Sequence, residues 1–347
     1  MDWEKALSRY GLLIEEKIGE YFSEVLDRAS TYHPFIKHVY GTLKEFVLRK
    51  GKRLASYSTL LTYSGYTDTF DDRILTVCVG IELYRHCILL HDDLIDRDDF
   101  RRGKTTVHKM FSEKRDERFG EGIAVFLGDI LYALAIEVLM SSGFEEDKLA
   151  EVLRTFSEGY REVNESQILD LLFEDKDVEA DEWYVMASKR AASLFKVTML
   201  VGAILGGATE RDLRLLEEAA TNIGYAFDIQ DDIIDTYASE YQYGRSPCSD
   251  LVLGKKPLHI VYALGSKNRK ESETLSMLLG KKPSMEEIEL ARLIIKDSGG
   301  LNASKERSKI HAEKAKTLIV DTSLNEESKE FFISFINYIE ESLEWYK

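Results

Sequence analysis

Two short clusters of aspartates are the residues in this sequence best suited to chemistry, because both repeat one spacing. Each is a DDxxD motif near an apolar run: Asp92, Asp93 and Asp96 form the first, and Asp231, Asp232 and Asp235 form the second. On a helix, the outer aspartates of each motif lie one turn apart on the same face. Carboxylates this close repel one another, and a divalent cation would remove that penalty. All-oxygen ligands suit Mg²⁺, which completes its shell with water and phosphate oxygens.

The duplication decides between two interpretations of these clusters. A single acidic cluster is more often a solvated helix face than a site. Two copies on mostly apolar helices can face each other across a bundle and hold several magnesium ions around a diphosphate, drawing electrons toward a leaving pyrophosphate. Cations follow each copy: Arg101 and Arg102 after the first, Lys255 and Lys256 after the second. The pattern therefore predicts metal-assisted diphosphate chemistry.

Further motifs accompany the aspartates along the chain. They are GKRL at Gly51, DDLIDRDDFRRG at Asp92, LGD at Leu127, SQILDL at Ser166, ASLF at Ala192, DIQDDIID at Asp228 and SDLVLGKK at Ser249. With these motifs, the chain from about residue 50 to at least residue 264 resembles the trans-isoprenyl diphosphate synthases, or polyprenyl synthetases, which make farnesyl and geranylgeranyl diphosphates. The first motif has two residues between its aspartates, as in the archaeal and eukaryotic short-chain enzymes.

The resemblance implies a reaction and the residues that carry it out. An allylic diphosphate and isopentenyl diphosphate would condense to a trans-prenyl diphosphate of geranylgeranyl length or longer, with Mg²⁺ assisting the loss of pyrophosphate. The metal ligands would be Asp92, Asp96, Asp231 and Asp235, with Asp93 and Asp232 completing the catalytic motifs. The substrate-binding residues would be Lys52, Arg53, Arg85, Arg101, Arg102, Gln167, Arg190, Asp228, Arg245 and Lys255. Among these, Arg101 would hold the allylic diphosphate and Arg102 isopentenyl diphosphate. A homodimer is also implied.

The sequence departs from the family pattern mainly around the acceptor. An arginine expected on isopentenyl diphosphate is Ala55, and the family's histidine is Arg85. Arg190 stands where the family usually has the lysine of a Lys-Thr pair, and Asp228 where it has the glutamine of a Phe-Gln pair. Arg245 stands where a lysine is common. Charge-assisted contacts to phosphate depend on geometry, so these exchanges are not neutral.

Three functions therefore remain open at this point. The first is chain elongation with isopentenyl diphosphate. The second is a prenyl-transfer or terpene-cyclisation enzyme of the class I type, with the same metal clamp and another acceptor; the altered positions Ala55, Arg85 and Asp228 favour it. The third is a non-catalytic subunit of a heteromeric synthase, which would have no need of six motif aspartates.

Composition excludes some partners. The chain has 347 residues, with 46 Lys and Arg against 62 Asp and Glu, a net charge of −16. This balance argues against nucleic acid and anionic membrane as partners. The three cysteines lack metal-binding spacing and are expected to be reduced, which favours a cytoplasmic protein. No transmembrane segment is expected.

Apolar residues recur at helical spacing through most of the chain, notably over 2–29, 73–95, 125–140, 146–173, 183–206 and 211–237. Only 4 prolines occur, and no Pro- or Ser-rich linker is present. We therefore expect one all-α domain over residues 1–347, a helical bundle of the isoprenoid synthase type with a central cavity. Residues 49–53 carry four positive charges where a helix should begin, and a bound phosphate would suit that position.

The residues before Asp92 predict the product length. The prenyl tail should descend along this helix, and family members that stop early tend to have an aromatic ring five residues before the first aspartate. That position is Cys87, with Ile88 beside it, and the next ring is Tyr84, one turn deeper. Tyr84 is therefore expected to be the stop, unless these are ordinary core residues and another helix sets the floor. The neighbouring histidines, among them His86, need no catalytic role.

Overall fold

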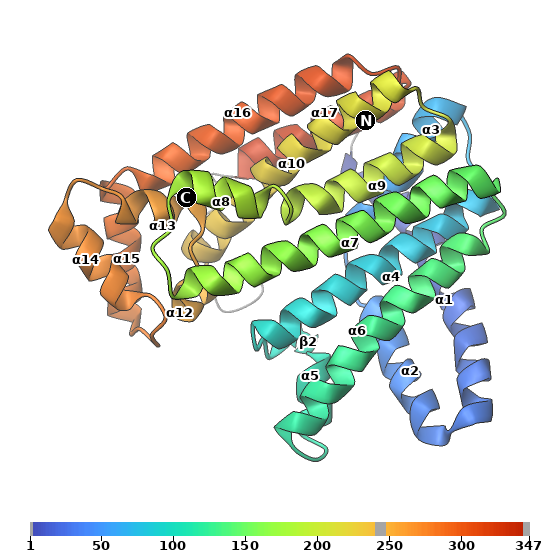
Figure 1. The fold of residues 1–347 in the computed structure, drawn as a ribbon, viewed down its shortest axis with the longest axis horizontal. Helices are drawn as coiled ribbons and strands as arrows, with labels where there is room; N and C mark the ends of the chain where they lie inside the picture. Colours follow the sequence, from blue (N-terminus) through green and yellow to red (C-terminus); the bar gives the residue numbers. More distant parts are fainter. Residues whose placement is uncertain (1–2, 240–247, 343–347) are drawn as a thin grey trace. The chain divides into compact units, whose positions relative to one another are not determined.

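The computed structural model describes residues 3–239 and 248–342, which are helical almost throughout (Figure 1). One two-stranded antiparallel hairpin interrupts the helices, with Phe100 paired to Thr105 and Arg101 to Lys104. The expected all-α class is therefore confirmed.

The chain divides into two compact units. Unit 1 comprises Met1–Arg154, Leu200–Ala208 and Asn325–Ser328; unit 2 comprises Thr155–Met199, Thr209–Leu324 and Lys329–Lys347. The elements up to the first boundary are α1 (Trp3–Tyr32), α2 (Pro34–Val47), α3 (Leu54–Thr67), α4 (Asp72–Ile95), β1 (Phe100–Arg101), β2 (Lys104–Thr105), α5 (Val107–Ser112) and α6 (Glu117–Met140). The boundaries fall inside α7 (Glu146–Glu174), α9 (Ala191–Gly206) and α17 (Glu326–Ser342). The other helices belong to unit 2: α8 (Ala180–Ala187), α10 (Glu210–Tyr237), α12 (Ser249–Leu253), α13 (Leu258–Leu264), α14 (Arg269–Leu278), α15 (Met285–Asp297) and α16 (Gly300–Val320).

Helix α4 is the central helix of unit 1. Asp71 caps it by accepting the backbone N–H of Arg73, and apolar residues around its whole circumference are buried. It packs along α6, as Figure 1 shows, and Gly80 permits the close approach, since a Cβ there would lie 3.1 Å from Leu139. A helix buried on all sides is a rigid support for the aspartates at its C-terminal end.

Helices α4 and α6 are long and apolar enough to cross a membrane by length and composition. Core helices of globular proteins meet the same criteria, and the most apolar window of α4 is 78% buried inside the protein. The corresponding window of α6 is only 44% buried, because Val125, Phe126 and Met140 remain exposed. Helix α6 therefore has an apolar face that unit 1 does not cover.

Helix α10 supports the second aspartate motif in unit 2. Thr209 caps its N-terminus, and the helix packs mainly along α16 (Figure 1). Buried residues of α10 such as Ile229 and Ile233 join the apolar core of the unit. The expected helix over 211–237 is thus confirmed.

Two local features differ from the sequence-based expectation. The helix expected over 183–206 is two helices, α8 and α9, separated by a turn at residues 188–190, where Lys189 and Arg190 both donate their backbone N–H to the carbonyl of Met186. The hairpin after the first motif was not predicted. Its turn residues, Arg102 and Gly103, both have positive φ (54° and 72°), which two-residue hairpins of this hand require. The prediction of one domain with a central cavity stays a prediction.

Candidate functional site

The first aspartate motif lies at the C-terminal end of α4. Asp92 and Asp93 belong to its last turn, and Asp96 is the C-cap, bonded through its N–H to the carbonyl of Asp92. Asp92 and Asp96 are partly exposed, whereas Asp93 is buried. The predicted one-face arrangement of Asp92 and Asp96 is therefore present at the end of the helix.

Arg101 of β1 lies against this motif. Its Nε donates to Asp93 Oδ1, and its Nη2 lies 3.4 Å from Asp92 Oδ2 and 3.5 Å from Asp98 Oδ2. Burial nevertheless raises the pKa of Asp93 to about 7, against the opposing effect of Arg101. Asp93 Oδ2 is buried and accepts no hydrogen bond within the described residues. The motif therefore keeps one buried carboxylate oxygen without a hydrogen bond inside the described residues.

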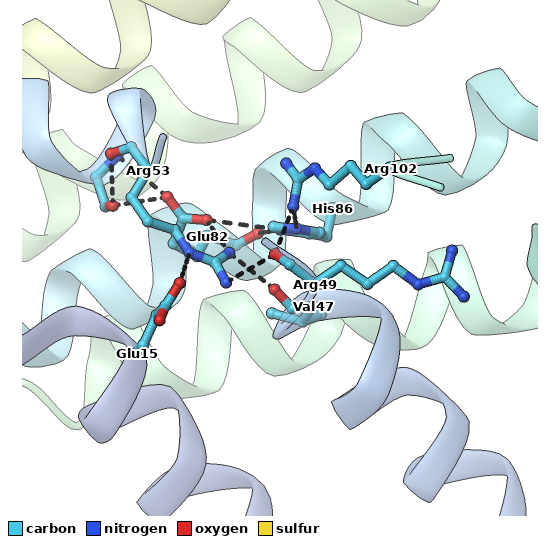
Figure 2. Close-up of polar contacts among 8 residues, drawn as sticks. Glu15, Val47, Arg49, Arg53, Glu82, His86 and Arg102 are labelled. Carbon is cyan, nitrogen blue, oxygen red and sulfur yellow. Dashed lines mark hydrogen bonds and ion pairs between the residues drawn. The ribbon is translucent and has the colours of Figure 1, made fainter. Parts of the chain in front are cut away.

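The basic segment at residues 49–53 contacts the base of the hairpin through Arg49, while its Arg53 lies against Glu15 and Glu82 (Figure 2). Arg49 donates through Nη2 to the carbonyl of Thr105 at 2.9 Å and through Nη1 to that of Arg101 at 3.3 Å. Arg53 is buried, and its guanidinium contacts Glu15 and Glu82 at 3.1 and 3.0 Å and the carbonyl of Val47 at 2.8 Å. In contrast, Lys52 is exposed. Of the two predicted substrate residues, Lys52 thus meets solvent, and Arg53 lies inside the protein.

Arg102 occupies the hairpin turn above this segment. Its Nη1 donates to the carbonyl of Arg49 at 3.1 Å and to His86 Nε2 at 3.2 Å. The residue keeps an exposed surface. Desolvation of the guanidinium and the nearby charges of Arg53 and Arg85 lower the pKa of Arg102 to about 10, although Glu82 opposes them. This concentration of positive charge beside the aspartate motif suits a diphosphate.

The three predicted chain-length residues lie on α4 in the two turns that precede Asp92. Tyr84 and Cys87 are fully buried, and Ile88 is partly buried. Cys87 lies near Tyr132 of α6, whose pKa is raised by burial and by Cys87. Of the three, Cys87 is therefore close to α6, and the chain-length role stays a prediction.

The second aspartate motif lies in the last turns of α10. Asp231 is exposed, and Asp235 is buried and accepts hydrogen bonds from Ser249 Oγ at 2.8 Å and the N–H of Asp250 at 3.3 Å. Burial and the neighbouring charge of Asp228 raise the pKa of Asp232, and its buried Oδ2 accepts no hydrogen bond within the described residues. This motif too has one buried carboxylate oxygen without a hydrogen bond among the described residues.

Arg190 gathers the acidic side chains of unit 2. It donates to Asp228 at 2.6 Å and to Asp170 at 3.1 Å, and it lies 3.8 Å from Asp232. Lys255 lies 3.5 Å from the other oxygen of Asp170. The turn between α8 and α9 thus brings together predicted residues that are far apart in the sequence.

The remaining predicted residues are less informative. Gln167 is partly exposed on α7, one turn before Asp170. Arg245 lies outside the described residues. Sequence reasoning did not predict that Glu82 binds Arg53, that His86 contacts Arg102 or that Gly51 lies against Arg102. The only hint in the sequence was the glutamate of the Ile-Glu-Leu run, which is Glu82.

A metal ion would need ligands beyond the protein. Within residues 3–239 and 248–342, no group of three or more His, Cys, Asp or Glu side chains is arranged to hold one. Mg²⁺ is commonly bound by one or two carboxylates together with substrate phosphates and water. Asp93 Oδ2 and Asp232 Oδ2 accept no hydrogen bond within the described residues, so each motif has a carboxylate oxygen that a further partner would satisfy.

The chain is similar to known proteins over most of its length. The family described as polyprenyl synthetase matches residues 36–294. A short chain isoprenyl diphosphate synthase of Methanocaldococcus jannaschii is 31% identical over 297 residues, 85% of this chain and 87% of that protein. A geranylfarnesyl diphosphate synthase of Aeropyrum pernix is 29% identical over 95% of this chain and 99% of its own length.

Solved structures with a similar fold are described as enzymes of the same kind. A geranylgeranyl pyrophosphate synthetase from Pyrococcus horikoshii aligns with a TM-score of 0.85 at 27% identity, over 98% of both chains. A geranylgeranyl pyrophosphate synthase from Corynebacterium glutamicum, described in complex with isoprenyl diphosphate and magnesium, aligns with a TM-score of 0.91 at 20% identity, over 99% of this chain and 100% of that one. The second likeness shows the fold.

Proposed function

The chain belongs to the polyprenyl synthetase family, and we propose that it is a trans-prenyltransferase that condenses an allylic diphosphate with isopentenyl diphosphate. The product is a trans-prenyl diphosphate of geranylgeranyl length or longer, as named for several relatives. The observation that carries the proposal is the paired motif, each copy at the end of a helix with one buried carboxylate oxygen that accepts no hydrogen bond within the described residues and an arginine beside it.

Asp92 and Asp96 in unit 1 and Asp231 and Asp235 in unit 2 are the proposed magnesium ligands. Bound there, Mg²⁺ would neutralise the allylic diphosphate and improve it as a leaving group. Burial raises the pKa of Asp93 and of Asp232, so both carboxyls are harder to ionise alone, and a bound cation would favour their charged form.

The cationic side chains hold the departing group. Arg101, Arg190 and Lys255 already contact motif or network carboxylates, and exchange those partners for diphosphate oxygens when substrate and metal bind. The allylic C–O bond breaks with its electron pair leaving on pyrophosphate, and fixed positive charge stabilises that developing charge. The acceptor's double bond then forms the new C–C bond, and the proton that the acceptor loses passes to pyrophosphate.

Lys52, Arg85 and Arg102 form the proposed acceptor subsite. Arg85 is partly exposed on α4, and its charge acts on Arg102. It therefore supplies the positive charge that Ala55 lacks. Arg53 contributes from inside the protein by holding the segment that carries Lys52.

The residues left are assigned to the allylic side of the reaction. Gln167, one turn from Asp170, contacts the leaving diphosphate or its metal shell, and Asp228 holds Arg190. Arg245, outside the described residues, keeps the substrate-binding role that the sequence predicts.

We further propose a cytoplasmic homodimer. The exposed apolar face of α6, formed by Val125, Phe126 and Met140, is where the second copy would bind. The three cysteines of the chain are free and buried, which supports a reducing compartment such as the cytoplasm. Light scattering of the parent and of Phe126→Glu tests the dimer; the variant should be monomeric.

One assay separates the candidate functions. Pyrophosphate release is measured with geranyl or farnesyl diphosphate, with and without isopentenyl diphosphate, in the presence of Mg²⁺. Release that requires isopentenyl diphosphate supports the proposal. Release without it indicates a cyclisation or another acceptor, which the departures at Ala55 and Asp228 favour. No release under either condition indicates a non-catalytic subunit.

A further inference from the structure

The guanidinium of Arg102 is bound along one side only. Both hydrogen bonds that it makes come from Nη1, to the carbonyl of Arg49 at 3.1 Å and to His86 Nε2 at 3.2 Å (Figure 2). Both acceptors are neutral. Within the described residues, Nε and Nη2 donate to no acceptor, and no carboxylate pairs with this arginine. The Nε–Nη2 edge is the planar edge that binds a phosphate through two parallel hydrogen bonds.

His86 can accept from Arg102 because its other nitrogen fixes the tautomer. Nδ1 lies 2.7 Å from the backbone carbonyl of Glu82, one turn earlier on α4. A carbonyl oxygen only accepts, so Nδ1 carries the proton and Nε2 offers a lone pair. Burial, against the opposing effect of Glu82, lowers the pKa of His86 to about 3, so the ring stays neutral at physiological pH.

A buried pair holds both acceptors of Arg102 in place. Arg53 binds Glu82 at 3.0 Å on α4 and also donates to the carbonyl of Arg49 at 3.3 Å. Glu82 in turn accepts from Ser56 Oγ at 2.6 Å. The loop carbonyl and the histidine are thus tied to one another behind the guanidinium, as Figure 2 shows.

Gly51 provides the space for the guanidinium. A Cβ at this position would lie 2.8 Å from Cζ of Arg102 and 2.9 Å from its Nη1. The backbone of Gly51 has no positive φ, so alanine could adopt it without strain. An alanine would therefore displace the end of the arginine side chain and leave the backbone in place.

We propose that His86 and Gly51 are positioning residues that aim the Nε–Nη2 edge of Arg102 at the diphosphate of the acceptor substrate. This inference rests on the proposed function for the identity of that substrate. A guanidinium held in its binding orientation before the ligand arrives loses less conformational entropy on binding. His86 itself touches no substrate; it acts through Arg102.

The test compares His86→Leu, His86→Gln and Gly51→Ala with the parent by steady-state kinetics in Mg²⁺. His86→Leu removes the acceptor, and His86→Gln restores one. We expect His86→Leu and Gly51→Ala to raise KM for isopentenyl diphosphate roughly tenfold or more, the loss expected of one charge-assisted hydrogen bond. The allylic KM should change little, and His86→Gln should recover most of the affinity. Matched controls are His108→Leu, another buried histidine of unit 1, and Gly19→Ala, whose Cβ would meet nothing within 4 Å.

A second readout does not depend on turnover. Isothermal titration with inorganic pyrophosphate compares the affinity of the parent with those of Arg102→Met, His86→Leu and Gly51→Ala. The affinity lost in Arg102→Met is the contribution of Arg102, here called its share of the affinity. The positioning variants should lose most of that share. Should the parent fail to use isopentenyl diphosphate while this loss is still seen, the proposed function is wrong and the positioning role stands. Unchanged affinity for both ligands, or equal changes in both substrates' KM, overturns the positioning role; if His86→Leu does not fold, Gly51→Ala decides.

Discussion

Arg190 and Asp228 form a partly buried ion pair, with Nη2 of the arginine 2.6 Å from Oδ2 of the aspartate. These are two of the positions at which the chain departs from the family it belongs to. The family usually has a lysine and a glutamine at these positions, so the contact there would join a cation to a neutral amide. The two departures are therefore one compensated change, in which a larger cation is matched by an added carboxylate.

Restoring the family residues singly should be worse than restoring both. Arg190→Lys replaces the forked guanidinium that contacts both Asp228 and Asp170 with a single ammonium, and Asp228→Gln removes the carboxylate that the guanidinium meets at 2.6 Å. Each should therefore lower kcat/KM for the allylic substrate, while the double variant recovers part of the loss. The coupling should be on the order of 1–3 kcal/mol, as for contacting buried charges. A double-mutant cycle of kcat/KM measures it.

The control cycle uses Lys189, which precedes Arg190 in the same turn, and Glu165 of α7, whose side chains are 41% and 43% exposed. Their coupling should be well under about 1 kcal/mol, because water screens exposed pairs. Additive effects of Arg190→Lys and Asp228→Gln would show that the two departures are independent.

The sequence was sufficient for elements whose signals are local. Asp71 and the apolar run after it predict the start of α4, and the period of 3.6 residues predicts its extent and the shared face of Asp92 and Asp96. The class of fold and the grouping of cations near each motif follow from the same local patterns.

Features that depend on contacts between distant residues were not predictable. The turn at residues 188–190 interrupts an apolar pattern typical of one continuous helix, and its Arg190 is held by Asp170 and Asp228. Arg53 resembles a phosphate ligand in sequence, but Glu82 lies 29 positions later in the chain and binds it inside the protein. The role of His86 depends on where Arg102 lies, and no sequence pattern encodes that position.

Activity should require both aspartate motifs. Asp92→Ala and Asp231→Ala should each reduce kcat by at least roughly 100-fold, on the order of 3 kcal/mol of barrier, because each removes a proposed metal ligand. Steady-state assays across a range of Mg²⁺ concentrations measure the loss. Asp99→Ala is the matched control, since Asp99 follows the motif, is exposed and pairs with Lys109. A folded Asp92→Ala or Asp231→Ala enzyme with near-parent activity would rule out the clamp.

Arg85 should act on the acceptor and not on the allylic substrate. Its charge lowers the pKa of Arg102, which places the two cations on the same side of the site. Arg85→Ala should therefore raise KM for isopentenyl diphosphate and leave the allylic KM nearly unchanged, and Arg85→His, the family residue, should be intermediate. Initial rates with each substrate varied in turn provide both constants. Equal changes in the two KM values would contradict this assignment.

Stability should depend on pH through His86. Its pKa is lowered to about 3 in the folded protein, against about 6.5 in an unfolded chain. Between these values the unfolded chain binds a proton that the folded protein does not, so stability is complete above about pH 6.5 and falls as the pH falls. Each pH unit in that window removes at most about 1.4 kcal/mol per histidine. His86→Gln should flatten this dependence in urea unfolding between about pH 6.5 and 4.5.

His259 provides the comparison, because burial lowers its pKa to about 3 as well and it lies in unit 2. His259→Gln should remove a similar part of the pH dependence, and the two substitutions should add. A His86→Gln protein with the parent's slope would mean that His86 is protonated or solvated in the folded state.

Product length should depend on Tyr84 and Cys87. Tyr84 is fully buried one turn below Cys87 on α4, roughly 4 to 5 Å deeper, which is about one five-carbon unit of prenyl chain. Cys87 lies near Tyr132 of α6, and its side chain is smaller than the ring that would block the tail at this position. We expect Tyr84→Ala to lengthen the product and Cys87→Phe to shorten it, while Tyr84→Phe, which keeps the ring, should not change it. Chromatography of the dephosphorylated products distinguishes these lengths. If Tyr84→Ala makes the parent's product, or the parent stops at farnesyl diphosphate, the floor is formed by another helix.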